Sequence, residues 1–273
     1  MRSDKLAMVL SVASGACAAV ASAMMLFYPR AFPPLPTGEV TTAGAEARGW
    51  SVVTLGVALP LLMVGLVTAR RGSVRGRIAW AGALAYLLYT FLELAVSPPF
   101  TPVYLICVAA FACALIALVA VAASVEVGAL PPLFTQAPRR ATAIYALAFA
   151  AVVAFAVLRR TVRGQVAWPQ GDTVITQVVE ALDLGLLVPF GIAAGVTLLL
   201  RRPVGYLLGG ALLVFAVCMG AALTAMAGAA AWAAGTSAQR AVPLAMLWVV
   251  AAALAVGFFR QPAPARFERH AHA

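Results

Sequence analysis

The chain has 273 residues, of which 64% are hydrophobic and only 10% are charged, and its mean hydropathy is +0.99. Soluble domains are nearer half apolar and a quarter charged, so this composition excludes a water-soluble fold. The formal charge of +10 comes almost entirely from arginines in short gaps between apolar runs. That pattern is typical of charges that set membrane topology, and it argues against a nucleic-acid partner.

The apolar residues form eight runs of about 20, the length that an α-helix needs to cross roughly 30 Å of hydrocarbon. The runs lie near residues 6–28, 50–69, 78–97, 103–123, 141–158, 177–200, 204–226 and 242–259. A chain in lipid must satisfy its backbone hydrogen bonds internally, and the runs lack the polar alternation of barrel strands. The sequence therefore predicts an all-α polytopic membrane helix bundle with about eight transmembrane helices.

The first run could instead belong to a cleaved signal peptide. Arg2 and Lys5 precede the apolar stretch, and Ala21-Ser22-Ala23 has the small residues of a cleavage site. The apolar run continues to Tyr28, however, and is long enough to span. We therefore expect this helix to be retained.

An internal repeat is the most informative feature of organisation. The segment 55–60 (LGVALP) resembles the segment 184–189 (LGLLVP), and each run ends in a double arginine at 70–71 or 201–202. The sequence therefore predicts two four-helix halves, 1–135 and 136–260, followed by a disordered cytoplasmic tail, 261–273. With four spans each, both halves have the same orientation, so the repeat should be parallel, with its axis along the membrane normal.

Both repeated segments end in a proline near the bilayer midplane, Pro60 and Pro189. Each proline removes a helical hydrogen bond and crowds the carbonyl four residues earlier, which belongs to Gly56 or Gly185. This pattern predicts either a packing kink or a flexible break beside a central cavity.

The distribution of basic residues predicts which side each loop faces. With the N-terminus inside, 13 of the 19 lie on the cytoplasmic side and 6 lie outside, with Arg159, Arg160 and Arg163 as a discordant outer cluster. An excess of Lys and Arg marks the cytoplasmic side. We expect a multi-pass protein of the bacterial plasma (inner) membrane with both termini cytoplasmic.

Several chemistries lack the residues they need. The two histidines, His270 and His272, fall in the predicted tail, so no histidine lies in a span to bind a haem or to complete a Ser-His-Asp triad. The sequence has no Walker A motif, dinucleotide fingerprint or paired CxxC, and all four cysteines fall in predicted spans. We therefore predict no catalytic residue, metal site or cofactor from motifs.

Acidic residues near the predicted outer face provide a candidate ligand site. In the third run Tyr86, Tyr89, Thr90 and Glu93 share one helical stripe, and Glu180 shares another with Asp183 in the sixth run. Counting about 1.5 Å per residue places Glu93 inside the hydrocarbon slab, where a carboxylate must face protein, water or a partner.

By depth, Arg48 is the nearest counter-charge for Glu93. We therefore predict that Glu93, Asp183, Glu180, Tyr89 and Arg48 form a ligand-binding group, with Glu93 facing the bundle interior. The alternative is that Glu93 forms a structural ion pair with Arg48, and that Glu180 simply lies at the membrane interface.

A stretch of the first half resembles a known group of proteins. The segments 82–89 (GALAYLLY), 98–100 (PPF) and 114–118 (ALIAL) are similar to uncharacterised multi-pass inner-membrane proteins of high-GC, actinobacterial-type bacteria. The resemblance covers the third and fourth runs, supports the class and location, and implies no activity.

Three functions remain compatible with the sequence. A membrane scaffold or accessory subunit explains the missing motifs and is the first hypothesis, with membrane lipids or another membrane protein as partners. A transporter or binder of a small lipophilic ligand would use the repeat, the prolines and the acidic group. A membrane-embedded enzyme acting on an isoprenoid or other lipid would use Glu93 and Asp183 as acid and base.

Overall fold

The computed structural model describes residues 2–28, 42–96, 102–162 and 173–260. Within these ranges the chain is helical, contains no β-strand and has eight helical stretches long and apolar enough to cross a membrane. The protein is therefore an all-α, multi-pass integral membrane protein, as the apolar runs predict. The predicted tail, with His270 and His272, lies outside the described residues.

Six of the described spans are single α-helices, and two consist of two α-helices joined by a π-helical turn. The single helices are α1 (Arg2–Phe27), α4 (Val74–Val96), α5 (Tyr104–Ala123), α6 (Arg139–Val162), α9 (Pro203–Ala233) and α10 (Ala241–Phe259). The composite spans are α2 (Thr42–Val53), η1 (Thr54–Ala58) and α3 (Leu59–Arg70), and α7 (Thr173–Leu182), η4 (Asp183–Leu187) and α8 (Val188–Leu199). Short 3₁₀ turns, η2 (Val127–Ala129), η3 (Pro131–Phe134) and η5 (Ala238–Arg240), lie in the connections.

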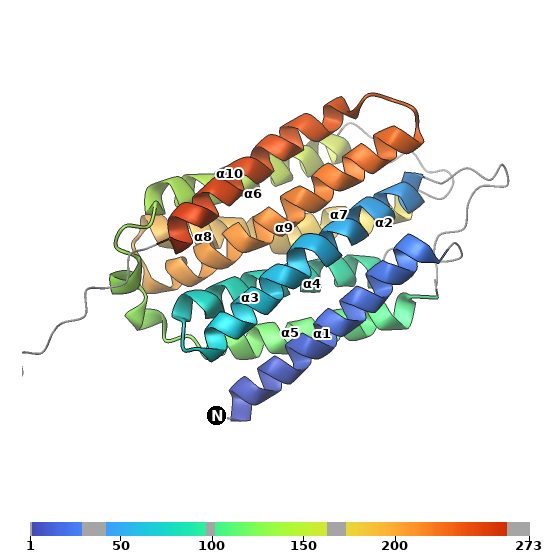
Figure 1. Cartoon of the computed structure of the whole chain (residues 1–273). Helices are drawn as coiled ribbons and strands as arrows, with labels where there is room; N and C mark the ends of the chain where they lie inside the picture. The colour runs from blue at the N-terminus through green and yellow to red at the C-terminus, as the bar shows by residue number, and fades with distance from the viewer. Residues whose placement is uncertain (1, 29–41, 97–101, 163–172, 261–273) are drawn as a thin grey trace, which may run out of the picture.

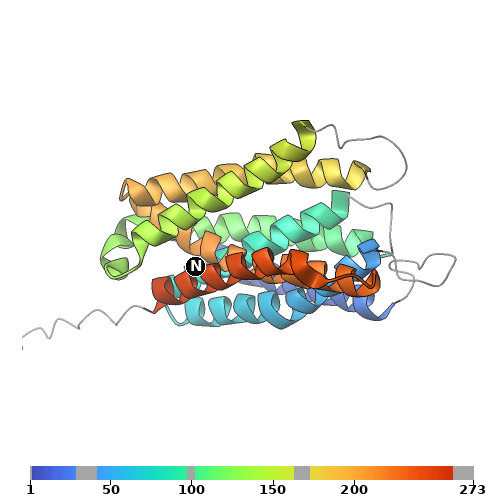
Figure 2. The same ribbon diagram turned by 90° about the horizontal axis from the view of Figure 1, so that it is seen from above.

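Helices α4 and α9 form the centre of the bundle. In their apolar windows 61% and 72% of the residues are buried, against 11% to 39% in the other spans. The two helices pack against each other, α2 packs on α9, and α3 and α5 pack on α4 (Figures 1 and 2). Their contact is close because Gly82 of α4 lies directly against Ala211 of α9.

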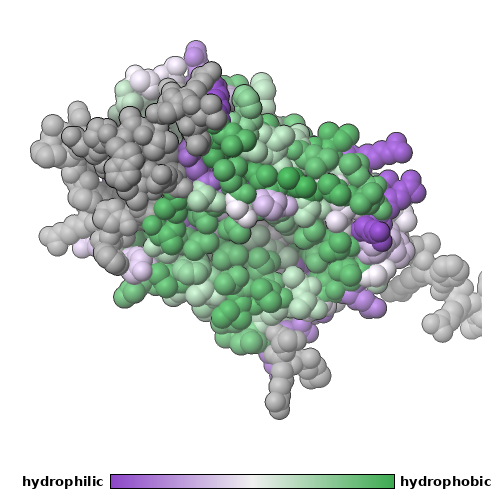
Figure 3. Space-filling model, turned by 180° about the vertical axis from the view of Figure 1, so that it is seen from behind, coloured by the Kyte–Doolittle hydropathy of each residue, from purple (hydrophilic) through white to green (hydrophobic). Residues whose placement is uncertain are grey.

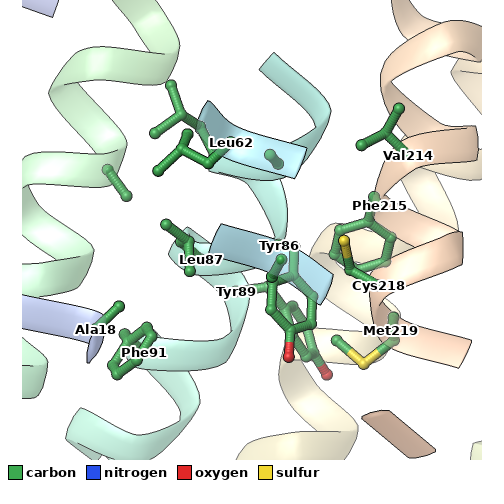
Figure 4. Packing of buried hydrophobic residues seen from close by; sticks show 14 of the residues in the cluster. Ala18, Leu62, Tyr86, Leu87, Tyr89, Phe91, Val214, Phe215, Cys218 and Met219 are labelled. Carbon is green, nitrogen blue, oxygen red and sulfur yellow. The ribbon is translucent and has the colours of Figure 1, made fainter. Parts of the chain in front are cut away.

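Buried polar side chains join the helices of the first half. The Trp80 indole donates to the Ser11 hydroxyl at 2.9 Å, which links α4 to α1. The Tyr86 hydroxyl accepts from the Trp50 indole at 2.8 Å and lies 3.1 Å from the Thr54 hydroxyl, which links α4 to α2 and η1. In the core, Tyr86 and Tyr89 lie side by side opposite residues of α9 (Figure 4). These bonds fix helix contacts that apolar packing alone leaves unspecific.

The outer surface is suited to lipid. Large apolar side chains such as Val9, Leu105, Phe155 and Met246 are exposed on different helices. The described surface seen from behind is mostly hydrophobic, and hydrophilic residues gather toward its ends (Figure 3). In water this surface would cause aggregation, whereas in a bilayer it contacts hydrocarbon.

Two predicted boundaries are wrong by about two helical turns. The second span begins at Thr42 rather than near residue 50, and the seventh continues to Ala233 rather than ending near 226. Both extensions are rich in alanine and therefore favour helix, but they are less apolar than the runs that they extend. As a result, Glu46 and Arg48 lie within a helix rather than at its start.

The two prolines have a common local structure. Each proline comes after a five-residue π-helical turn, with one residue between them. Turn η1 contains Gly56 and precedes Pro60, and η4 contains Gly185 and precedes Pro189. A proline cannot donate a hydrogen bond to the preceding turn, and a π turn accommodates the crowded carbonyl by widening the helix. The sequence therefore locates the irregularity, and the structure shows that it is a wider turn.

The predicted repeat pairs these positions of the two halves. The same shift along the chain that carries Thr54 onto Asp183 also carries Val74 onto Pro203, the first residues of α4 and α9. The outer helices differ, because α1 packs mainly on α5 whereas α6 packs mainly on α8. The division into halves 1–135 and 136–260 stays a prediction.

The membrane orientation is tested by labelling two cysteines introduced into the full chain. Thr135 and Thr236 are both exposed, in the α5–α6 and α9–α10 connections. With a cytoplasmic N-terminus, we expect Thr236→Cys to react with a membrane-impermeant maleimide in intact cells and Thr135→Cys to react only after permeabilisation. The parent chain measures the reaction of the native cysteines. Labelling of both sites in intact cells would contradict the eight-span topology, and the reverse pattern would contradict the orientation.

Candidate functional site

Two cavities adjoin beside the central helix α4. The first, here called the apolar cavity, has a volume of about 320 Å³ and lies between α4, α5, η4–α8 and α9. The second, the acidic cavity, has a volume of about 200 Å³ and includes Glu93 and Asp183 in its wall. Tyr89 and Leu187 line both cavities. An apolar chamber therefore meets a polar one at a shared wall.

The side chains that line the apolar cavity are hydrocarbon with one exception. Its wall includes small residues of α4 and α5, such as Ala85 and Ala122, that leave space, and larger residues such as Phe190 and Phe215 that bound it. The exception is the hydroxyl of Tyr89. Small side chains on adjacent helices therefore create a space that suits an alkyl chain.

Tyr89 connects the central helix to the π turn of the second half. Its hydroxyl donates to Oδ1 of Asp183 at 2.5 Å, and its ring makes an edge contact with Phe215, the ring centroids being 5.9 Å apart. This distance is typical of an O–H···O⁻ bond. Asp183 is the first residue of η4, so the π turn begins at the polar wall of the cavity.

Glu93 lies one helical turn beyond Tyr89 on the same face of α4 and is half-buried. Two other carboxylates, Asp183 and Glu46 of α2, lie close enough to act electrostatically on Glu93. Three helices thus bring negative charge to one region. Such an arrangement favours a positively charged or hydrogen-donating group.

The five residues predicted from sequence have different positions. Glu93, Asp183 and Tyr89 come together at the acidic cavity. Glu180 is half-buried on α7 and does not line that cavity, and Arg48 is exposed on α2 and does not line it either. Arg48 therefore does not belong to the cavity that holds Glu93, whereas Glu46 of the same helix acts electrostatically on Glu93.

Other residues of the acidic cavity carry little signal in the sequence. Thr90 belongs to the predicted stripe, but Trp50, Phe149 and Met219 come from three other helices. Each is an ordinary apolar residue in a membrane span, so its role depends on tertiary packing. Tyr86, in contrast, is fully buried between its bonds to Trp50 and Thr54 and is structural.

Among the described residues, no three His, Cys, Asp or Glu side chains form a group that could hold a metal ion. The four cysteines, Cys17, Cys107, Cys113 and Cys218, are free thiols within described helices. The chemistry of the site therefore rests on carboxyl and phenol groups beside an apolar chamber. Comparison of the chain with protein-family models, curated proteins and solved structures finds no match.

Proposed function

We propose that this membrane protein binds a small lipophilic molecule that has a hydrocarbon portion and a cationic or hydrogen-donating end. The observation that carries this proposal is the meeting of the apolar and acidic cavities at Tyr89 and Leu187. The hydrocarbon portion occupies the apolar cavity, and the polar end contacts Glu93 and Asp183.

The size and lining of the apolar cavity support the first part of this proposal. Its volume of about 320 Å³ lies in the range of small-molecule sites. Each methylene group transferred from water into such a space contributes about 0.8 kcal/mol to binding. For a ligand already dissolved in lipid, close packing against the cavity wall contributes instead.

The carboxylates support the second part. A charged carboxylate at membrane depth costs several kcal/mol unless a partner offsets the lost hydration. A ligand ammonium, guanidinium or hydroxyl donor in the acidic cavity would supply this offset for Glu93. The Tyr89 bond already orients Asp183 toward the same space.

A scaffold, the first hypothesis from sequence, needs packed helix surfaces but gives no role to the paired cavities. Transport is a second candidate, because π turns η1 and η4 interrupt two spans and such turns are frequent at functional sites and bends. The enzyme hypothesis would also use Glu93 and Asp183, and ligand identity would decide whether they meet a reactive bond.

The proposal is tested with two probes of equal chain length and opposite charge, dodecylamine and dodecanoate. We expect the purified protein in nanodiscs to bind dodecylamine in preference to dodecanoate. Ala122→Trp, which fills the apolar cavity, should weaken dodecylamine binding at least about tenfold, because the indole ring occupies space that the alkyl chain needs. Native mass spectrometry measures the bound fraction.

Ala109→Trp is the matched control, since Ala109 is exposed on the same helix as Ala122. It should leave binding unchanged. Equal binding of both probes, or equal loss in both variants, would contradict the proposal. Uptake of dodecylamine into protein-containing liposomes, beyond binding, would favour transport over a binding role.

A further inference from the structure

A separate groove lies at the arginine-rich end of the bundle. It has a volume of about 470 Å³ and lies between α3 and α10, with α4 and α9 as its floor. Its walls are apolar along most of their length, with Val64 and Val256 exposed on opposite sides. At one end the groove is polar, where Arg75 and Arg260 line it.

The two arginines lie at the same end of the molecule. Arg75 is in the first turn of α4, and Arg260 directly follows α10. Arg75 is oriented by the α5–α6 connection, because its guanidinium donates to the Leu133 carbonyl at 3.2 Å and lies 5.8 Å from the centre of the Phe134 ring. Arg260 is exposed. No described residue that lines this groove is acidic.

We propose that this groove binds one anionic phospholipid of the surrounding membrane. An acyl chain lies against Val64 and Val256, and the headgroup phosphate lies between Arg75 and Arg260. Charge complementarity selects this occupant, because two guanidinium groups and no lining carboxylate favour an anion over a zwitterion. Basic pockets between spanning helices at a membrane interface suit anionic headgroups for the same reason.

The location of the groove agrees with a lipid rather than a water-soluble ligand. Phe259 belongs to its apolar wall and is adjacent to Arg260, so hydrocarbon and positive charge occur at successive residues where a span ends. A lipid at a bilayer surface presents the same succession of phosphate and chain. The groove is distinct from the acidic cavity, because the residues that line it differ from those around Glu93.

The proposal is tested by native mass spectrometry of the delipidated protein with phosphatidylglycerol, phosphatidylcholine of the same acyl chains, or inorganic phosphate. We expect the protein to retain one phosphatidylglycerol in preference to phosphatidylcholine. Inorganic phosphate alone should not be retained. Arg260→Gln should weaken phosphatidylglycerol binding about fivefold, and Arg75→Gln/Arg260→Gln about twentyfold or more. The reason is that each basic residue near an anionic membrane surface raises affinity by roughly fivefold.

The matched control is Arg71→Gln/Arg202→Gln, which removes the same charge from exposed positions outside the groove. It should change the preference less than twofold. Equal effects of the two double variants would show a general surface charge effect and overturn the site. If loss of the Arg75 contacts prevents folding, the single variant Arg260→Gln still tests the site. An unchanged affinity for phosphatidylglycerol in Arg260→Gln would also overturn the proposed site.

Discussion

Replacing Gly82 by alanine is expected to destabilise the protein by about 1–3 kcal/mol, and replacement by leucine by more, because either side chain must separate the two central helices. A Cβ atom at Gly82 would lie 2.6 Å from the Ala211 carbonyl oxygen and 2.6 Å from Val214 Cβ. Neither neighbour is the end of a flexible side chain. The measurement is the midpoint temperature of unfolding in detergent, which is monitored as the loss of monodisperse protein on heating.

Gly228→Ala in α9 is the control, because a Cβ atom there would meet nothing within 4 Å. This substitution should be neutral or stabilising by up to about 1 kcal/mol, since alanine favours helix more than glycine does. If Gly82→Ala is as stable as Gly228→Ala, the helices are not held at the close distance that the structure shows.

The Gly82 contact has a special position under the predicted repeat. The shift that carries Thr54 onto Asp183 carries Gly82 onto Ala211, the residue it touches. When equivalent residues of two repeats contact each other, the symmetry axis passes through their contact. We therefore propose that the parallel repeat has its axis at the α4–α9 crossing.

The two lateral cavities agree with this proposal. The apolar cavity lies between α5 and α8, and the groove that includes Arg75 and Arg260 lies between α10 and α3. Under the repeat these are equivalent places, and the same shift carries Ala85 of one onto Val214 of the other. Under the predicted repeat the two grooves would therefore have related positions but different polar ends, the Tyr89 hydroxyl in one and two arginines in the other.

The spans could be predicted because membrane thickness fixes the length of an apolar run. The π turns could be located but not identified, since a proline shows where a hydrogen bond is lost and not how the helix adjusts. The central position of α4 and α9 could not be predicted, because all spans are apolar and the signal for helix contact lies in a few small residues such as Gly82.

The candidate site shows the same limit. Tyr89, Glu93 and Asp183 could be grouped because helical spacing gives depth, and depth brought them to one level. The same reasoning also groups Arg48 with them. Residues two apart in a helix point about 200° apart, so Glu46 and Arg48 share a depth but face different neighbours. The rotation of α2 depends on its packing with α9, which the sequence does not specify.

Substituting Glu93 by glutamine is expected to abolish cation preference while leaving the fold intact. Glutamine keeps the shape of the side chain and its hydrogen-bonding capacity but removes the negative charge. A hydrogen bond to a charged group contributes about 1.5–3 kcal/mol, so dodecylamine binding should weaken roughly 10- to 100-fold in Glu93→Gln. Asp183→Asn should have a similar effect, because asparagine still accepts a bond from Tyr89.

These results separate a ligand site from a structural ion pair. If Glu93 stabilised the fold through a counter-charge, glutamine would leave a buried charge unpaired and lower the unfolding temperature by several degrees. At a ligand site, glutamine removes unfavourable charge from a region that also holds Asp183 and Glu46, so stability is retained or rises while binding is lost. Glu180→Gln is the control, since it removes one acid from the helix that precedes Asp183 without changing the cavity wall. A fall in stability without loss of binding would contradict the proposed site and favour the scaffold hypothesis, because the carboxylates would then serve helix packing alone.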